Sequence, residues 1–286
     1  MIQNERSKAV GRYVTEFHGA MTEVPKSNKA ETGEDTTLEV LFSPAEFAGL
    51  ERRDLSETTC VVFDVLRATS SMVTALANGA EAIIPVQEIA EALALRQKQS
   101  DLLLAGEREG VRILSPLTGS ISFDLGNSPL EFTTERIGGR MIVMTTTNGT
   151  RALRACAQAK SVLLGSFLNL RATSAALEQA APERLMLVCS GTFEEAAYED
   201  VLGVGALCDL LWPSYGAGVV SDSVQIARRL YLLEATDLST AAAHSRNGRR
   251  LLANKELRED VPFCLQRDRF NLVAELGKDG AVRCKR

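Results

Sequence analysis

Seven short apolar runs, most of them followed by a helical pattern, constrain the fold of this chain more than any other feature. The runs lie at 38–42, 60–66, 81–86, 101–106, 140–145, 161–166 and 184–190. They are apolar throughout rather than alternately apolar and polar, as strands are when both faces of a largely parallel sheet are covered. The helical patterns lie at 69–78, 88–99, 148–158, 170–181 and 195–212. The repeated order of strand and helix predicts a three-layer α/β/α fold with a largely parallel or mixed sheet.

The two ends of the chain differ from this body. Residues 1–36 mix charges with small polar residues and show no period, which predicts a flexible N-terminal tail. After Trp212 and Pro213 the strand signal fades, and residues 222–269 are expected to form helices that cap one end of the sheet. No linker divides the remainder, so we expect a single α/β domain over 37–286 with a mostly helical C-terminal part.

Composition excludes several classes of protein. The chain has 32 Lys and Arg residues against 37 Asp and Glu, a net charge of −5, and no basic block provides an electrostatic footprint for nucleic acid. No run approaches the roughly 18 apolar residues that a membrane span needs, and the N-terminus lacks the apolar segment of a signal peptide. The six cysteines form no CxxC pair, which favours a reduced, cytoplasmic setting. We expect no nucleic-acid or membrane partner, and a homodimer is compatible with the sequence.

Polar side chains follow five of the predicted strands at the point where each strand ends. They lie in DVLRATSS (64–71), AGEREG (105–110), TTTNGT (145–150), GSFLN (165–169) and CSGT (189–192). Because ligands bind outside the carboxyl ends of the strands in open α/β sheets, we expect these segments to converge at one edge and to form the functional site. Ser166 and Asn169 in the fourth segment are candidate substrate-binding residues.

The segment TTTNGT is typical of an oxyanion receptor. At the start of a helix it offers hydroxyls, an amide and free backbone N–H groups, and a glycine allows close approach of the backbone. The alternative is that Thr147 caps the helix and the other residues fill turn positions. The candidate substrate-binding residues are Thr145, Thr146, Thr147 and Gly149, with Asn148 as a candidate catalytic residue.

Two further segments pair an acid with a base. Asp64 is expected to hold a hard cation through oxygen, and Arg67 to grip an oxyanion with its two-pronged guanidinium, with Thr69 also contacting substrate. The alternative is a local ion pair between Asp64 and Arg67, with Thr69 as a cap. Glu107 and Arg108 repeat the pairing as a metal ligand and a substrate ligand, and their alternative is a solvated pair in a loop.

Three residues elsewhere complete the predicted site. Asn127 lies in the segment FDLGNSP (123–129), inside a long irregular stretch of the kind that is usually functional or disordered; it either faces the site or makes a turn before Pro129. Glu199 and Asp200 begin a helix at a strand exit and are candidate metal ligands, although the helix dipole alone favours acids there.

Spacing excludes several routes of phosphoryl transfer. The chain has no GxxxxGK[ST] motif, so it is not a P-loop NTPase. A paired-aspartate phosphatase has a second aspartate two positions after the first, where this chain has Leu66 after Asp64. No cysteine has an arginine six residues further on, which excludes the loop of tyrosine phosphatases. The only histidines are His18 and His244, too few for a histidine-rich zinc site. What remains is Mg²⁺ held by carboxylates, with Arg, Thr and Asn around a phosphate. Cys189 is expected to be a buried structural thiol.

Seven motifs in order resemble the 2-phosphosulfolactate phosphatase family. They are VVFDVLRATSS, LANGAEAIIPV, LLAGEREG, FDLGNSP, TTTNGTRAL, GSFLN and YEDVLGVGAL. The resemblance implies a Mg²⁺-dependent phosphatase that converts (R)-2-phospho-3-sulfolactate to 3-sulfolactate and phosphate, a step toward coenzyme M in methanogens. The substrate is a small anion, and its three acid groups suit the cationic and amide donors of Arg67, Arg108, Asn127, Asn148 and Asn169. A phosphatase for another phosphorylated acid and a non-catalytic sensor of such ligands are the alternatives.

Overall fold

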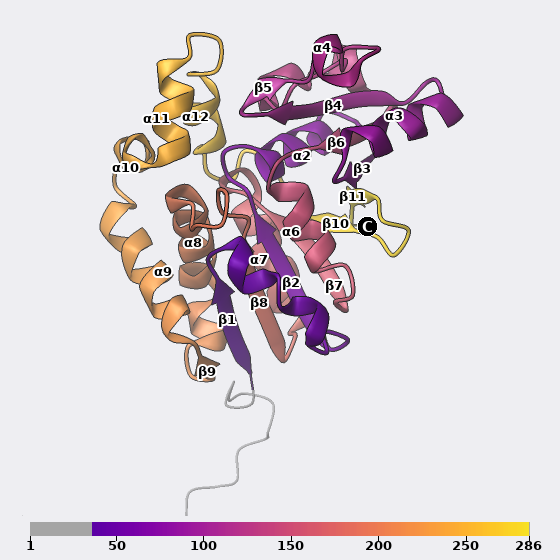
Figure 1. Ribbon diagram of the computed structural model, residues 1–286. Coiled ribbons are helices and arrows are strands. Elements are labelled where there is room, and N and C mark those ends of the chain that lie inside the picture. The colour runs from indigo at the N-terminus through magenta and orange to yellow at the C-terminus, as the bar shows by residue number, and fades with distance from the viewer. Residues whose placement is uncertain (1–35, 286) are drawn as a thin grey trace, which may run out of the picture. The chain divides into compact units, whose positions relative to one another are not determined.

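The structure is a computed structural model that describes residues 36–285. All of the predicted tail except Thr36 therefore lies outside the described residues, as does His18. The described residues form one sheet of 11 strands in the order β5-β4-β6-β3-β11-β10-β7-β2-β8-β1-β9 (Figure 1). The strands are β1 (Thr37–Leu41), β2 (Thr58–Phe63), β3 (Ala82–Val86), β4 (Leu103–Arg108), β5 (Val111–Arg112), β6 (Met141–Thr145), β7 (Ser161–Gly165), β8 (Arg184–Cys189), β9 (Val219–Val220), β10 (Ala274–Leu276) and β11 (Val282–Cys284).

All seven predicted strands are present, and they pair with one another in parallel. Strands β7, β2, β8 and β1 form one parallel group, and β3, β6 and β4 form another. The short hairpin of β10 and β11 joins the two groups through antiparallel pairs. Three further strands, β9, β10 and β11, follow Trp212, where the strand signal of the sequence fades. These strands have two or three residues each and carry charges at Glu275 and Arg283, so they lack the continuous apolar run that identified the others.

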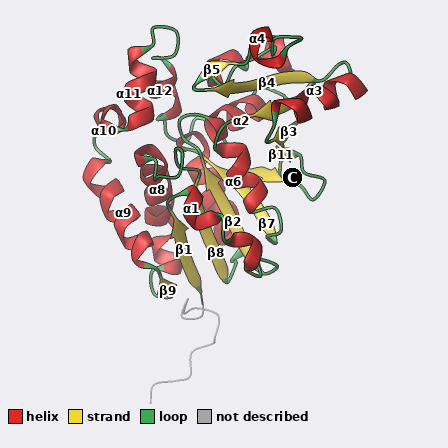
Figure 2. Cartoon of the chain, viewed as in Figure 1, coloured by secondary structure: helices red, strands yellow, loops and turns green. Residues whose placement is uncertain are grey.

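The five predicted helices form within a few residues of the expected bounds. They are α2 (Ala68–Ala77), α3 (Ile89–Lys98), α6 (Gly149–Ala155), α7 (Leu170–Ala180) and α8 (Tyr198–Tyr215). The expected helical segment after Trp212 is also present, as α9 (Asp222–Glu234), α10 (Leu238–His244), α11 (Arg246–Ala253) and α12 (Asp260–Cys264). The short helices α1 (Pro44–Phe47) and α4 (Ser115–Thr118), which Figure 2 labels, and α5 (Thr134–Ile137) lie in the connections. None of the described helices is long and apolar enough to cross a membrane.

Strand β2 shows why the fold has three layers. Its side chains alternate between two apolar clusters: Val61 and Phe63 pack with α7, α8 and α9, whereas Cys60 and Val62 pack with α2 and α6. All six residues of the strand are buried. A strand buried on both faces needs a continuous apolar run, which is the pattern that predicted the parallel sheet.

The register of the parallel strands brings several strand exits together. Phe63 at the end of β2 is paired with Cys189 at the end of β8, and Gly106 of β4 is paired with Thr145 at the end of β6. Helices α11 and α12 lie beyond this edge of the sheet (Figure 2) and contribute side chains to it. The C-terminal helices thus cover the carboxyl ends of the strands.

Candidate active site

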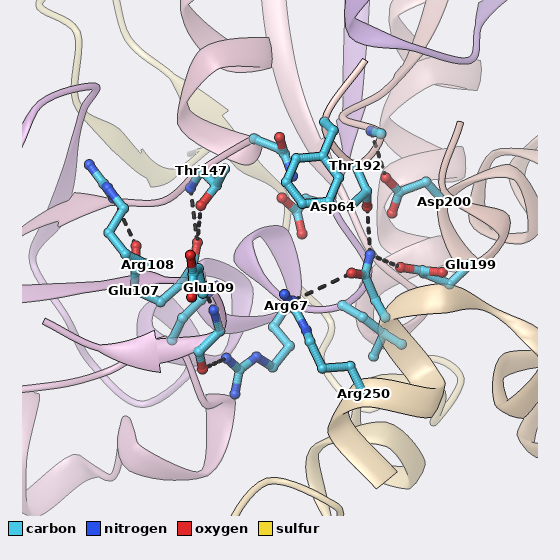
Figure 3. A pocket seen from close by; sticks show the side chains of 17 residues that line it. Asp64, Arg67, Glu107, Arg108, Glu109, Thr147, Thr192, Glu199, Asp200 and Arg250 are labelled. Carbon is cyan, nitrogen blue, oxygen red and sulfur yellow. Dashed lines mark hydrogen bonds between the residues drawn. The ribbon is translucent and has the colours of Figure 1, made fainter. Parts of the chain in front are cut away.

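A pocket of about 230 Å³ lies at the carboxyl ends of β2, β4, β6 and β8. Nine of the predicted site residues line it: Asp64, Arg67, Glu107, Arg108, Asn127, Thr147, Asn148, Glu199 and Asp200. The residues come from loops up to about 136 positions apart, and Figure 3 shows most of them around one space. The predicted convergence of strand exits is therefore confirmed for these nine.

Asp64 is the first residue after β2. Its Oδ1 accepts a hydrogen bond of 2.9 Å from the N–H of Ala68, which opens α2. Its Oδ2 lies beside Gly149: a Cβ added there would be 2.8 Å from this oxygen and 2.6 Å from the Cβ of Ala68. Burial, and then the nearby charges of Glu107 and Glu199, raise the pKa of Asp64 to about 6. The N-terminus of α6 can approach this carboxylate so closely only because residue 149 is glycine.

Asp200 and Glu199 reach the pocket from the first turn of α8. Asp200 joins two strand exits, because Oδ1 accepts from the N–H of Val65 over 2.8 Å and Oδ2 from the N–H of Gly191 over 3.1 Å. Burial, with the charges of Asp64 and Glu199, raises the pKa of Asp200 well above its ordinary value. This carboxylate therefore ties the exits of β2 and β8 together at the pocket.

Glu199 has one occupied and one unpaired oxygen. Its side chain is 1% exposed, and Oε1 accepts a hydrogen bond of 2.6 Å from Nδ2 of Asn247. Oε2 is buried and has no hydrogen-bond partner in the described chain. An unpaired buried carboxylate oxygen is costly and points to a bound ion or donor that completes it.

Glu107 organises the loops on the other side of the pocket. Its Oε1 accepts from both the N–H and the hydroxyl of Thr147, each over 2.9 Å, and its Oε2 accepts from the N–H of Gly110 over 2.6 Å. Gly110 follows Glu109 in the turn between β4 and β5, and both have positive φ, 81° and 53°. Glu107 thus fixes this turn and the start of the 145–150 segment.

Arg67 is not available as the predicted oxyanion grip. Its Nη1 forms an ion pair of 2.6 Å with Oδ2 of Asp260, and the two side chains are 3% and 0% exposed. Its Nη2 donates to the carbonyl of Gly110 over 2.8 Å. The alternative of a local pair with Asp64 is also wrong, because the partner lies 193 positions away on α12, where no local pattern indicates it.

Arg108 is bound within the fold as well, although it lines the pocket. Its Nη1 donates to the carbonyl of Glu107, and its Nη2 donates to the carbonyl of Gln87 and to the hydroxyl of Thr145. The alternative of a solvated pair between the side chains of Glu107 and Arg108 is therefore wrong. Thr145 does not line the pocket, and its hydroxyl donates to Gln87.

The helix after β6 begins differently from either expectation. The residue at its N-cap is Asn148 rather than Thr147, and no side-chain hydrogen bond caps it. Thr146 lies behind the pocket wall, with its hydroxyl accepting from the N–H of Thr150 over 3.3 Å. Of the residues predicted here, Thr147 and Asn148 line the pocket, and Gly149 contacts Asp64 rather than the cavity.

Three predicted ligands do not reach the pocket. The hydroxyl of Thr69 exchanges hydrogen bonds with the backbone of Asp64, and the capping alternative is also wrong, because the N-cap of α2 is Arg67, with no side-chain capping hydrogen bond. Ser166 and Asn169 are fully buried and form a capping box that closes the turn after β7. The chain at 268–270 covers this turn through hydrogen bonds to Phe167 and Leu168. The prediction that these three residues bind substrate is corrected for that reason.

Several residues that line the pocket were not predicted: Asn247 and Arg250 come from α11, and Phe193 comes from the turn after β8. Gly191 and Thr192 lie in the segment CSGT, which was expected at this edge without a role for either residue. Nδ2 of Asn247 donates to Thr192 over 2.7 Å as well as to Glu199. The expected cap of helices indicated this region, but neither apolar periodicity nor a strand exit marks its polar residues.

Two findings bear on cofactors and on cysteine chemistry. Among residues 36–285, no group of three or more His, Cys, Asp and Glu side chains is arranged to hold a metal ion. Cys189 is completely buried, and burial raises the pKa of its thiol well above its usual value. The prediction of a buried structural thiol is thus confirmed.

The chain is similar to proteins of one family over most of its length. A model of the family described as 2-phosphosulpholactate phosphatase matches residues 47–279. A protein of Caldanaerobacter subterraneus named probable 2-phosphosulfolactate phosphatase is 36% identical to this chain, over 83% of the chain and 95% of the relative. A protein of the same name from Caldicellulosiruptor saccharolyticus is 37% identical, over 77% of the chain and 90% of the relative. A protein of the same name from Thermotoga petrophila is 38% identical over 76% and 88%.

Proposed function

Because the chain belongs to the 2-phosphosulfolactate phosphatase family, we propose that it is a Mg²⁺-dependent phosphoric monoester hydrolase. Its substrate is (R)-2-phospho-3-sulfolactate, and its products are 3-sulfolactate and inorganic phosphate. The observation that carries the proposal is the group of buried carboxylates that line the pocket at the strand exits, Asp64, Glu199 and Asp200, one of which keeps a buried oxygen without a partner in the described chain.

The charge of the pocket supports a requirement for a cation. Five acidic side chains line it against three arginines, and one of these arginines is neutralised by Asp260. A substrate with a phosphate group would be repelled from such a surface. In a poorly solvated site the repulsion between like charges at close range is on the order of several kcal/mol. A bound divalent cation removes this repulsion.

The donor set fits Mg²⁺. This ion is usually held by one or two carboxylates together with waters and phosphate oxygens rather than by a cage of protein ligands. The absence of a three-residue cluster among residues 36–285 is compatible with that mode. We assign the ion to Asp64 and Glu199, because Asp200 and Glu107 already accept backbone hydrogen bonds on both oxygens. When bound, Mg²⁺ supplies charge neutralisation at the phosphoryl oxygens.

The chain's own groups position the reactants. Asn148 lines the pocket beside Thr147, and in this proposal its amide N–H donates to a phosphoryl oxygen. Asp200 and Glu107 hold the loops at fixed positions through their backbone contacts. In the reaction the oxygen of a water bonds to phosphorus as the bond from phosphorus to the ester oxygen breaks; the water gives up one proton, and the ester oxygen takes up one to become the hydroxyl of sulfolactate. The alternative is a covalent phosphate on Asp64, which trapping of a phosphorylated enzyme tests.

Release of inorganic phosphate tests the proposal directly. Phosphosulfolactate, phospholactate and phosphoglycerate are each incubated with the protein, once with Mg²⁺ and once with EDTA. We expect release from phosphosulfolactate with Mg²⁺ and loss of that release in EDTA. Preference for phospholactate or phosphoglycerate would identify a phosphatase of another acid. No release from any of the three, with binding unaffected by EDTA, would instead indicate a non-catalytic sensor and overturn the proposal.

A further inference from the structure

Arg250 places a guanidinium in the pocket that the activity described above does not use. It extends from α11, and Figure 3 shows it reaching toward the middle of the pocket, with Asp64 and Asp200 on the far side. A Cβ added at Gly110 would lie 3.4 Å from its Cζ and Nη2. The guanidinium therefore packs over the backbone of the β4–β5 turn, at a residue whose φ of +81° favours glycine.

The guanidinium of Arg250 is far less engaged than those of the other two pocket arginines. Its Nη2 is 3.4 Å from Oδ1 of Asn247, a long hydrogen bond, and among residues 36–285 it forms no ion pair. The two terminal nitrogens of Arg67 are held by Asp260 and Gly110. Those of Arg108 are held by the backbone and by Thr145. Arg250 is thus the pocket arginine whose guanidinium is least engaged by the described chain, which leaves its paired donors available to a ligand.

A phosphoryl group held near Asp64 and Glu199 does not require this donor. We propose that Arg250 binds an acid group of the substrate other than the phosphate, a sulfonate or a carboxylate, and so sets the preference for esters that carry one or two further acid groups. This inference rests on the proposed function. A second acid group would otherwise meet the carboxylates that line the small cavity, and the planar fork of arginine matches two oxygens of such a group.

A series of three phosphate esters tests the assignment. Phosphosulfolactate carries sulfonate and carboxylate, phospholactate lacks the sulfonate, and isopropyl phosphate lacks both. We expect Arg250→Gln to lower kcat/KM for phosphosulfolactate by about 10- to 100-fold, the usual cost of a lost charge-assisted pair. The change for isopropyl phosphate stays within about threefold. A parallel loss with phospholactate identifies the carboxylate as the group bound, and an unchanged value for phospholactate identifies the sulfonate.

Two further variants separate recognition from general charge. Arg249→Gln removes the same charge from the residue before Arg250 on α11, which does not line the pocket. We expect kcat/KM for all three esters to change by less than about threefold in this variant. Arg250→Lys keeps the charge without the fork and should restore only part of the loss. Equal losses for all three esters in Arg250→Gln would overturn the inference.

Binding of 3-sulfolactate, followed by calorimetry, gives a measurement that does not depend on turnover. We expect the wild-type protein to bind this phosphate-free acid, and Arg250→Gln to weaken the binding by about 10-fold or more. Absence of binding, or equal binding by both proteins, would overturn the inference even if phosphate is released. If no ester yields phosphate but only the wild type binds sulfolactate, the proposed function fails and the role of Arg250 stands.

Discussion

Asn247 donates a hydrogen bond of 2.6 Å to Oε1 of Glu199, and Oε2 of the same carboxylate is buried without a partner. The two residues lie on different helices, α11 and α8, and the same amide also donates to Thr192. The bond holds one oxygen of the carboxylate in place and leaves the other free, in a residue that lines the pocket. The C-terminal helix α11 therefore contributes a side chain that holds a residue of the pocket and does not only cover it.

Asn247→Ala should weaken Mg²⁺ binding by about 10- to 100-fold, the usual effect of losing a group that orients a metal ligand. Because the ligand itself remains, activity should recover at saturating Mg²⁺. Titration calorimetry with Mg²⁺ and activity as a function of Mg²⁺ concentration measure the two effects. Combining Asn247→Ala with Glu199→Gln should add little to the single loss. Full additivity would show that Asn247 does not act through Glu199.

Removing Asp260 should strongly destabilise the fold. Its pair with Arg67 is almost fully buried, and loss of one partner leaves an uncompensated charge, so Asp260→Ala should lower the free energy of unfolding by about 3–5 kcal/mol. The double variant Arg67→Met with Asp260→Leu removes both charges and should recover a large part of this loss. Chemical denaturation measures both values. A loss below about 1 kcal/mol in Asp260→Ala would contradict the buried pair.

Gly149→Ala should impair both stability and turnover. Its added Cβ would meet Ala68 at 2.6 Å and Oδ2 of Asp64 at 2.8 Å, so α6 must move away from the carboxylate, at a cost of about 1–3 kcal/mol. Gly49→Ala is the matched control, since the nearest atom to its Cβ is 3.8 Å away. Thermal denaturation and phosphate release of both variants are compared. Equal thermal stability and equal phosphate release of the two variants would show that the close approach of α6 to Asp64 is not required.

The pKa of Asp64 makes a prediction for the metal-free protein. Its carboxyl has a pKa of about 6 in the fold against 3.8 in a model compound, so the folded protein binds this proton more tightly. Below pH 3.8 the carboxyl is protonated in both the folded and the unfolded protein, so its burial does not lower the free energy of unfolding. As the pH rises from 3.8 to about 6, the unfolded protein loses this proton first and the folded state loses stability. In EDTA, Asp64→Asn should therefore match the wild type near pH 4 and exceed it by about 1–3 kcal/mol at pH 8. A stability difference that does not change with pH would contradict this burial.

The sequence predicted the parts of the fold that repeat. Continuous apolar runs such as 60–66 identified the seven parallel strands because burial on both faces requires them. The hairpin of β10 and β11 could not be predicted in the same way, because strands of three residues carry too little pattern. The chain that precedes the hairpin bonds to Phe167 and Leu168 in the turn that contains Ser166 and Asn169, and local turn chemistry alone could not reveal this cover.

The candidate site was predictable where strand exits determine it. Asp64, Asn148 and Asp200 follow from the rule that exits of parallel strands meet at one edge. The partners of Arg67 and Glu199 were not predictable, since Asp260 and Asn247 lie 193 and 48 positions away and reach the site only through tertiary packing. Arg250 belongs to the same group, because its separation from the strand exits along the chain hides its position in the pocket.

Phosphate release from phosphosulfolactate by Asp64→Asn, with saturating Mg²⁺, is the most direct test of the central claim that the buried carboxylates at the strand exits perform the hydrolysis. The substitution keeps the size of the side chain, so circular dichroism should show an unchanged fold. We predict that turnover falls by at least about two orders of magnitude relative to the wild type. Turnover within about threefold of the wild type in a folded variant would contradict the account.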